Sequence, residues 1–221
     1  ITERKAAIEK TYYNADTGDF AEDIQGANSF AEDIGIGGEK TFDNIVRKYQ
    51  KRGMYDTGIF GTDILTRILF ERTQGQLAFD LLAGEKKVSF HTMMAAGATT
   101  LWEYWSGKKS HSHPMFGAVT RYLYYYLLGI RQTADSTEFA HIVVEPVIPD
   151  GLDFATGHIT TRFGIISVAW QKQTDTVLFT IEIPPVVQAK FTYNGKELVL
   201  NAGINSFSAD LRTDVGGKGS I

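Results

Sequence analysis

The chain has 221 residues, of which 43% are hydrophobic and 22% charged, and its formal net charge is −4. This composition is typical of one large or two modest globular domains, and the net negative charge argues against nucleic acid or an anionic membrane as a partner. The sequence has no cysteine and no long apolar run, which excludes thiolate chemistry and predicts no membrane-spanning segment. It opens ITERKAAIEKTYYN, without an initiating methionine, so we expect a portion of a longer protein, and no compartment is indicated.

Helical periodicity runs through residues 1–131. We predict a first helix over residues 1–13, ended by a turn at Asn14–Gly18. A second helix is indicated by apolar side chains at i, i+3, i+4 and i+7, namely Phe42, Ile45, Val46 and Tyr49.

Further helical segments are predicted in this half of the chain. Thr62 is expected to cap a helix whose apolar face consists of Ile64, Leu65, Ile68 and Leu69. We expect Leu77–Ala83 to continue this helical run, which is closed by Gly84. The segment GAVTRYLYYYLLGI, residues 117–130, is apolar nearly all round and predicts a fully buried helix.

Beyond a polar linker at Arg131–Thr137, the apolar period changes to two, which is typical of strands. Two runs alternate in this way, with apolar members Ile166, Val168 and Trp170 in the first and Val177, Phe179, Ile181 and Ile183 in the second. The pair Asn194-Gly195 predicts a tight hairpin turn, and the glycine-rich stretch Gly216–Ser220 predicts disorder. About seven short strands indicate a β-sandwich over residues 138–221.

The stretch GATTLWEYWSG, residues 97–107, surrounds Glu103 with Trp102, Tyr104 and Trp105. A structural interpretation is a capping box, in which Glu103 reaches back to the amide of Thr100 at the start of a short helix. A functional interpretation is a carbohydrate site, because apolar walls raise the pKa of a carboxyl group and aromatic faces stack on sugars.

The stretch SHSHPMFG places His111 and His113 two residues apart. The pair invites a zinc interpretation, but no third ligand with suitable spacing is present, and we expect neither a metal nor a cofactor. A loop histidine that bonds backbone carbonyls, or one that donates to a sugar hydroxyl, remains open. In the stretch DTGIFGT, residues 56–62, Phe60 is either part of a helix entry or a ring at the mouth of a pocket.

In order and spacing, DTGIFGT, GATTLWEYWSG and SHSHPMFGAV resemble the C-terminal part of bacterial α-L-rhamnosidases (glycoside hydrolase family 78) over about residues 10–170. The resemblance implies an inverting glycosidase built as an (α/α)₆ barrel followed by an antiparallel β-sandwich. It also implies that Glu103 is the general base, that His113, Trp102 and Trp105 contact the rhamnose, and that Phe60 lines the pocket. Ser106 and Ser112 stand where Asp and Asn are expected, which affects the finer substrate contacts.

An inverting glycosidase needs a second carboxyl group as general acid, and no stretch here resembles the family's acid motif. We therefore predict the C-terminal half of the barrel over residues 1–131 and the sandwich over 138–221, with the acid outside this chain. The expected partners are α-L-rhamnosides and the rest of the enzyme, or a second copy through self-association.

Two alternatives stay open at this point. One is another (α/α)₆ glycosidase or a phosphorylase, which would need basic phosphate ligands such as Lys108 and Lys109 near Glu103. The other is a non-catalytic carbohydrate-binding fragment, for which the sandwich offers only Trp170, on a strand face where core packing explains it better.

Overall fold

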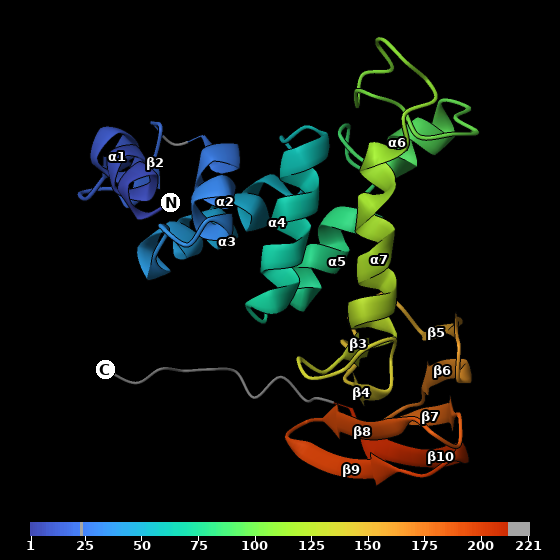
Figure 1. Ribbon diagram of the computed structural model, residues 1–221. Helices are drawn as coiled ribbons and strands as arrows, with labels where there is room; N and C mark the ends of the chain where they lie inside the picture. Colours follow the sequence, from blue (N-terminus) through green and yellow to red (C-terminus); the bar gives the residue numbers. More distant parts are fainter. Residues whose placement is uncertain (23, 212–221) are drawn as a thin grey trace. The chain divides into compact units, whose positions relative to one another are not determined.

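The computed structural model describes residues 1–22 and 24–211, and its internal contacts divide the chain into two units. The first unit is Ile1–Tyr122, which is helical, and the second begins at Leu123 and is built of strands (Figure 1). A helical part followed by an antiparallel β domain confirms the predicted fold class. The boundaries 1–131 and 138–221 stay a prediction. Within the described residues, no helix has the length and apolarity needed to cross a membrane.

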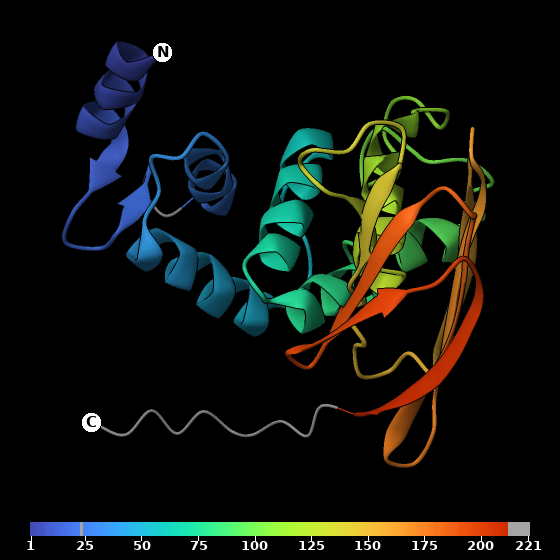
Figure 2. The ribbon, with the colours of Figure 1, turned by 60° about the horizontal axis from the view of Figure 1, so that its bottom comes forward.

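The first unit is a succession of helices in which α2 to α5 lie side by side (Figures 1 and 2). The elements in chain order are α1 (Thr2–Tyr12), β1 (Tyr13–Asn14), β2 (Asp19–Phe20), α2 (Gln25–Asp33), α3 (Glu39–Arg52), α4 (Ile59–Glu71), α5 (Gly75–Ala83), α6 (Phe90–Ala95), the 3₁₀ helix η1 (Pro114–Val119) and α7 (Thr120–Tyr122).

The amphipathic stripes of this unit are largely buried as predicted, although Val46 and Ile64 are only partly buried. In α3, Phe42, Ile45 and Tyr49 are buried, and in α4 Leu65, Ile68 and Leu69 are buried. Gly84 ends α5, and the turn at 14–18 connects the short β1–β2 hairpin. The prediction succeeds for α3 and α4 because an apolar stripe of this length determines both that a helix forms and which of its faces is buried.

A buried polar network fixes the β1–β2 hairpin to α2 and α3. The Asp19 carboxylate accepts from Asn28 at 2.8 Å, from Asn44 at 3.0 Å and from Lys48 at 3.2 Å. Burial by itself would raise the pKa of Asp19, but the donors Asn28 and Lys48 outweigh it and hold that pKa below its usual range. The ionised carboxylate is therefore the form that the fold requires.

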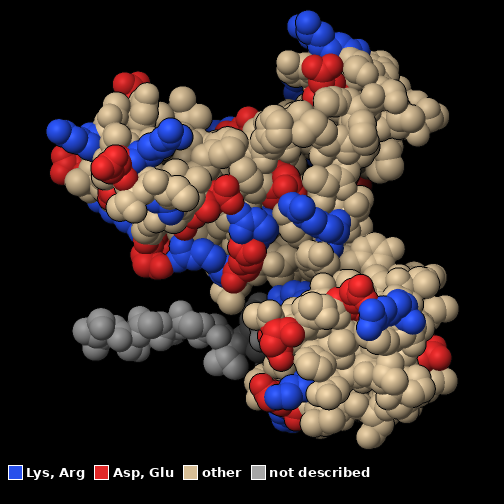
Figure 3. Space-filling model, in the orientation of Figure 1, with Lys and Arg blue, Asp and Glu red and all other residues tan. Residues whose placement is uncertain are grey.

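Ion pairs connect α4 to its neighbours. Arg72, just after α4, pairs with Glu32 of α2 at 2.9 Å and with Glu39 of α3, and its guanidinium lies 4.0 Å from the centre of the Phe42 ring. Burial raises the pKa of Glu32 although Arg72 opposes this. Lys and Arg are interspersed with Asp and Glu on the face of this unit that Figure 3 shows, with no extended basic surface on that face.

The start of α4 differs from the prediction. Thr62 is not the capping residue, because the helix begins one turn earlier, with Gly58 as N-cap in extended backbone. The Thr62 amide already donates to the Gly58 carbonyl at 2.9 Å, and its hydroxyl lies 3.0 Å from that of Thr57. The two glycines of DTGIFGT allow the chain to enter the helix before the threonine.

The prediction of one fully buried helix over residues 117–130 is also wrong. The segment passes from η1 through α7 into a π-helical turn, η2 (Leu123–Leu127), in which the Leu128 amide donates to the Leu123 carbonyl at 2.9 Å. Tyr124 and Tyr125 are partly exposed, so the segment is not buried all round. It ends at Gly129, whose φ is +77° and where a side chain would collide with the backbone of Glu145.

The second unit is a β-sandwich of two four-stranded sheets in the described residues. One sheet has the order β10-β7-β6-β5 and the other β3-β4-β8-β9. Neighbouring strands pair antiparallel except β4 and β8, which pair parallel. The strands are β3 (Ile130–Gln132), β4 (His141–Val144), β5 (Phe154–Thr161), β6 (Gly164–Lys172), β7 (Thr176–Ile183), β8 (Gln188–Tyr193), β9 (Lys196–Leu200) and β10 (Gly203–Asp210).

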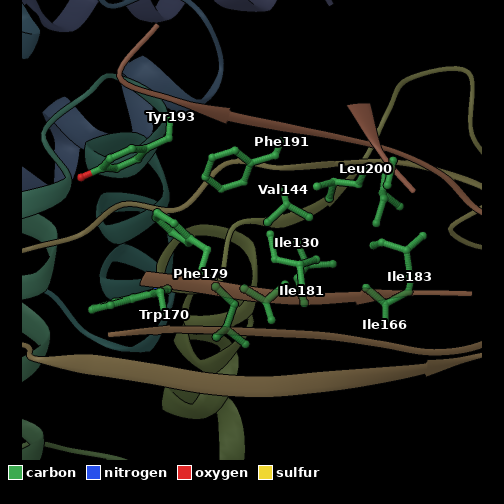
Figure 4. Close-up of a cluster of buried hydrophobic side chains, with 14 of the residues drawn as sticks. Ile130, Val144, Ile166, Trp170, Phe179, Ile181, Ile183, Phe191, Tyr193 and Leu200 are labelled. Carbon is green, nitrogen blue, oxygen red and sulfur yellow. The ribbon is translucent and has the colours of Figure 1, made fainter. Parts of the chain in front are cut away.

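The sandwich core follows the alternation in the sequence. Val177, Phe179, Ile181 and Ile183 of β7 are buried, and the labelled residues in Figure 4 lie between the two sheets. Asn194 and Gly195 have φ of 51° and 72° and form the predicted turn between β8 and β9. The one misplaced element is β3, because Ile130–Gln132 was assigned to the end of a helix and to the linker. The disorder predicted for 216–220 lies outside the described residues.

Candidate active site

A pocket of about 390 Å³ lies in the helical unit. Four segments line it: α2 with the residue before it, the entry to α4, the loop that carries Glu103, and η1 through Phe116. The lining residues that bear on its chemistry are Phe30, Asp56, Phe60, Glu103, Tyr104 and Trp105. The structure therefore brings together Glu103, Trp105 and Phe60 from the predicted set, while Trp102 and His113 do not line this pocket.

The loop that carries Glu103 is a narrow ribbon and not a helix. The His113 amide donates to the Leu101 carbonyl at 2.8 Å, and the Glu103 amide donates to the Ser110 carbonyl at 2.8 Å. Residues 100–106 form no helix, so the capping-box interpretation of Glu103 is wrong. The Glu103 carboxylate accepts from the Ser110 amide at 3.3 Å, a long bond that leaves most of its acceptor capacity for other groups.

Trp102 and His111 hold this ribbon closed. Their rings stack with centres 4.5 Å apart and planes 18° from parallel, and the His111 Nε2 lies 2.7 Å from the Gly107 carbonyl oxygen. Gly107 has φ of +69°, and a Cβ there would lie 2.9 Å from a carbon of the Trp102 ring. Trp102 is buried, so its visible role is to shape the loop rather than to offer a face to a ligand.

Trp105 forms one wall of the pocket and is itself fixed on two sides. Its ring is parallel to that of Tyr55 at 5.8 Å, and its Nε1 donates to the Thr57 carbonyl at 2.7 Å. Burial raises the pKa of Tyr55, which therefore packs as a neutral phenol. This bond joins the loop of Glu103 to the DTGIFGT segment, which explains why two sequence motifs 48 positions apart share one pocket.

Phe60 stands in the first turn of α4 with 62% of its surface exposed, and Tyr104 of the loop is 50% exposed. Both line the pocket, and this position agrees with the interpretation of Phe60 as a ring at the mouth of a pocket. The ring of His113 makes no hydrogen bond within the described part of the chain. It is therefore available to a ligand, although it lies outside the lining of this pocket.

Several lining residues were not predicted as site residues. They come from α2 and the residue before it (Ile24, Gly26 and Phe30), from the entry to α4 (among them Asp56 and Thr57), from the loop of Glu103 (Tyr104) and from η1 (Phe116). A signal for α2 exists in the sequence, because Ala27, Phe30, Ala31 and Ile34 recur at i, i+3, i+4 and i+7. Asp56 opens the stretch DTGIFGT, which was a candidate for the mouth of a pocket, but only the fold shows that it shares a pocket with Glu103.

Among residues 1–22 and 24–211, no group of three or more His, Asp or Glu side chains is placed to hold a metal ion. The pocket lining, within the same residues, includes no Lys or Arg. Lys108 and Lys109 follow Glu103 in the ribbon but do not line the pocket. The visible chemistry is therefore that of carboxylates between aromatic rings, a combination typical of carbohydrate sites.

A helical domain with a carboxylate pocket, followed by an antiparallel β-sandwich, is the arrangement expected of a six-hairpin glycosidase. Residues 1–127 match the family described as bacterial alpha-L-rhamnosidase 6 hairpin glycosidase domain, and residues 129–203 match the bacterial alpha-L-rhamnosidase C-terminal domain. The chain belongs to the bacterial α-L-rhamnosidase family, as the sequence motifs predicted.

Individual relatives agree with this assignment. An alpha-L-rhamnosidase from Alteromonas sp. (strain LOR) is 30% identical over 146 residues, which are 61% of this chain and 16% of the relative. The chain thus spans about a sixth of that relative's length. A crystal structure of the Streptomyces avermitilis alpha-L-rhamnosidase complexed with L-rhamnose has the same fold, with a TM-score of 0.83 at 19% identity over 94% of this chain and 23% of that one. The native Aspergillus terreus enzyme also has a TM-score of 0.83, at 18% identity, covering 94% of this chain and 26% of that one.

Proposed function

We propose that this chain is part of an inverting α-L-rhamnosidase that removes terminal α-L-rhamnose, with Glu103 as the general base. The observation that carries the proposal is the position of Glu103 in a pocket lined by aromatic rings, on a ribbon whose backbone bonds fix it. A general base must be held within hydrogen-bond reach of the water that it activates. The two backbone bonds across the ribbon and the Trp105–Thr57 bond support such a position.

In the proposed reaction, Glu103 removes a proton from water as that water attacks the anomeric carbon. A carboxylic acid on the opposite side protonates the leaving oxygen, and the two carboxyl groups of an inverting enzyme lie roughly 6.5–9.5 Å apart. Asp56 shares the pocket but already accepts from Tyr49 and pairs with Arg52, and such donors favour a role as acceptor. We therefore assign the general acid to a residue outside this chain.

The other proposed contacts are those of the rings and of His113. Trp105, Tyr104 and Phe60 offer apolar surface to the C–H faces of the sugar. His113, whose amide donates to the Leu101 carbonyl across the ribbon, is proposed to donate from its ring to a rhamnose hydroxyl. The family's substrate and the carboxylate pocket both favour a glycosidase over a phosphorylase, for which the described lining offers no basic ligand.

The sandwich gives little support to a separate carbohydrate-binding role. Trp170 is 2% exposed and its Nε1 donates to the Leu127 carbonyl at 2.7 Å, so it belongs to the core of its unit. A ring that is buried and already bonded has no free face for a sugar.

The test is replacement of Glu103 in the full-length enzyme that contains this chain. Glu103→Gln is expected to lower kcat by about 10²–10⁴-fold with little change in affinity for a rhamnoside. The matched control is Glu71→Gln, because Glu71 is paired with Arg67 on α4 and does not line the pocket.

A chemical rescue identifies the role more directly. In Glu103→Ala, sodium azide is expected to restore turnover and to yield the β-L-rhamnosyl azide, because azide attacks without losing a proton. If Glu103→Gln keeps more than about a tenth of the wild-type kcat, or if azide gives no rescue in Glu103→Ala, Glu103 is not the base.

A further inference from the structure

A second acidic residue, Asp56, lines the pocket, and the proposed reaction has no step for it. Asp56 follows Tyr55 in the entry to α4 and lines the same pocket as Glu103 and Trp105. Its side chain is 26% exposed, so it is neither buried in the core nor free on the surface.

Each oxygen of this carboxylate already has a partner within the protein. The Tyr49 hydroxyl donates to Oδ1, and the Arg52 guanidinium pairs with Oδ2. Tyr49 is fully buried in α3, and burial, followed by its bond to Asp56, raises its pKa, so it stays a donor at every physiological pH. The position of the Asp56 oxygens is thus set before any ligand arrives.

An ionised carboxylate has about four lone-pair sites, and the two donors use two of them. The remaining capacity, one site on each oxygen, matches two neighbouring hydroxyl groups of a sugar, each of which donates one hydrogen bond. We propose that Asp56 is a binding residue that accepts hydrogen bonds from hydroxyl groups of the glycone and helps to select it. This inference rests on the proposed function, because it assumes that the pocket takes a sugar.

The chain contains a matched arrangement that separates this role from a structural one. Asp63 of α4 accepts from the Tyr122 hydroxyl at 2.9 Å and pairs with Arg121 at 2.6 Å, so it has the same two kinds of donor. Asp63 does not line the pocket. An Asp–Tyr–Arg group therefore does not by itself indicate a ligand, and the pocket lining is what distinguishes Asp56.

The test uses the full-length enzyme with methyl α-L-rhamnoside and its 2-, 3- and 4-deoxy analogues as inhibitors. In the wild type, removing a hydroxyl that Asp56 binds is expected to weaken inhibition by about 10- to 100-fold, as for a hydrogen bond to a charged group. Asp56→Asn is expected to bind the parent glycoside weaker by a similar factor and to lose the discrimination against that analogue. Asp63→Asn keeps the wild-type pattern.

The outcomes separate the two proposals. If the wild type neither hydrolyses nor binds rhamnosides, the proposed function fails and this inference fails with it. If the wild type is active but discriminates against none of the three analogues, the inference alone is overturned, whether or not Asp56→Asn folds. The same holds if Asp56→Asn keeps the wild-type selectivity among the analogues, because a purely structural role would change stability and not selectivity.

Discussion

At the scale of single residues, the roles that we propose for the pocket carboxylates follow from the partners of each carboxylate and not from its residue type. Glu103 and Asp56 are both carboxylates of one pocket, but their partners differ. Glu103 has one long bond from a backbone amide, whereas Asp56 is held by a buried tyrosine and an arginine. We therefore propose the reactive role for the first and the binding role for the second.

His113 belongs to the same scale. We predict that His113→Ala in the full-length enzyme lowers turnover and affinity together, by about 5- to 100-fold, because a sugar hydroxyl loses its donor. Steady-state kinetics with a chromogenic rhamnoside measure the change. His91→Ala is the control, since His91 is exposed on α6 and does not line the pocket.

The same experiment separates a sugar contact from a metal ligand. Activity of the wild type is expected to survive a chelator and to be unaffected by added zinc. Loss of activity with a chelator, restored by zinc, would support a metal site at His111 and His113 and contradict the sugar contact.

At the scale of elements, the sequence correctly predicted the helices and strands that are marked by a long apolar pattern. The stripes of α3 and α4, the alternation in β6 and β7 and the Asn194-Gly195 turn were all found where the pattern placed them. Patterns of this length specify a buried face as well as an element, so tertiary contacts do not override them.

The failures are at short segments whose form depends on neighbours distant in sequence. The ribbon at 100–113 is closed by a ring stack between Trp102 and His111, which no local propensity encodes. The segment 114–130 changes helix type and then ends at Gly129, where the backbone of Glu145 approaches too closely for any side chain. Of the predicted site residues, Glu103, Trp105 and Phe60 line the pocket, whereas Trp102 and His113 do not. The joining of two motifs through the Trp105–Thr57 bond could not be predicted from sequence.

A prediction at this scale concerns the ribbon. Gly107→Ala adds a Cβ 2.9 Å from a carbon of the rigid Trp102 ring, at a φ of +69°. We expect the ribbon to shift and kcat of the full-length enzyme to fall more than about tenfold, because small displacements of a catalytic group cost large factors in rate.

Gly97→Ala is a matched control for the backbone strain alone. Gly97 has φ of +85° in the same loop, and a Cβ there meets no atom within 4 Å. Gly107→Ala should lose more thermal stability than Gly97→Ala, because it adds the collision with the Trp102 ring to the backbone strain, and only Gly107→Ala should lose turnover. Equal kinetics for the two variants would mean that the ring stack does not position Glu103.

At the scale of the whole molecule, the chain combines a helical unit with a carboxylate pocket and a sandwich with a continuous core, and it spans only 16% of its Alteromonas relative. Around the pocket, four large apolar side chains are exposed: Ile24 (61%), Phe30 (45%), Phe60 (62%) and Tyr104 (50%). Apolar surface that is gathered in one place rarely stays exposed to water. The rim of the pocket is therefore a surface that other protein or a ligand is expected to cover.

We predict that the 221-residue chain alone does not hydrolyse rhamnosides and self-associates through this rim. Without a general acid to protonate the leaving oxygen, a water activated by Glu103 has little to displace. Light scattering and a chromogenic rhamnoside assay on the purified chain measure both parts. Phe60→Ser is expected to reduce self-association, whereas Val199→Ser on the sandwich, where Val199 is 77% exposed, is expected to leave it unchanged. If the purified chain is monodisperse and has measurable turnover, the general acid lies within these residues. If Asp56→Asn then abolishes that turnover, Asp56 is the acid and not the proposed binding residue.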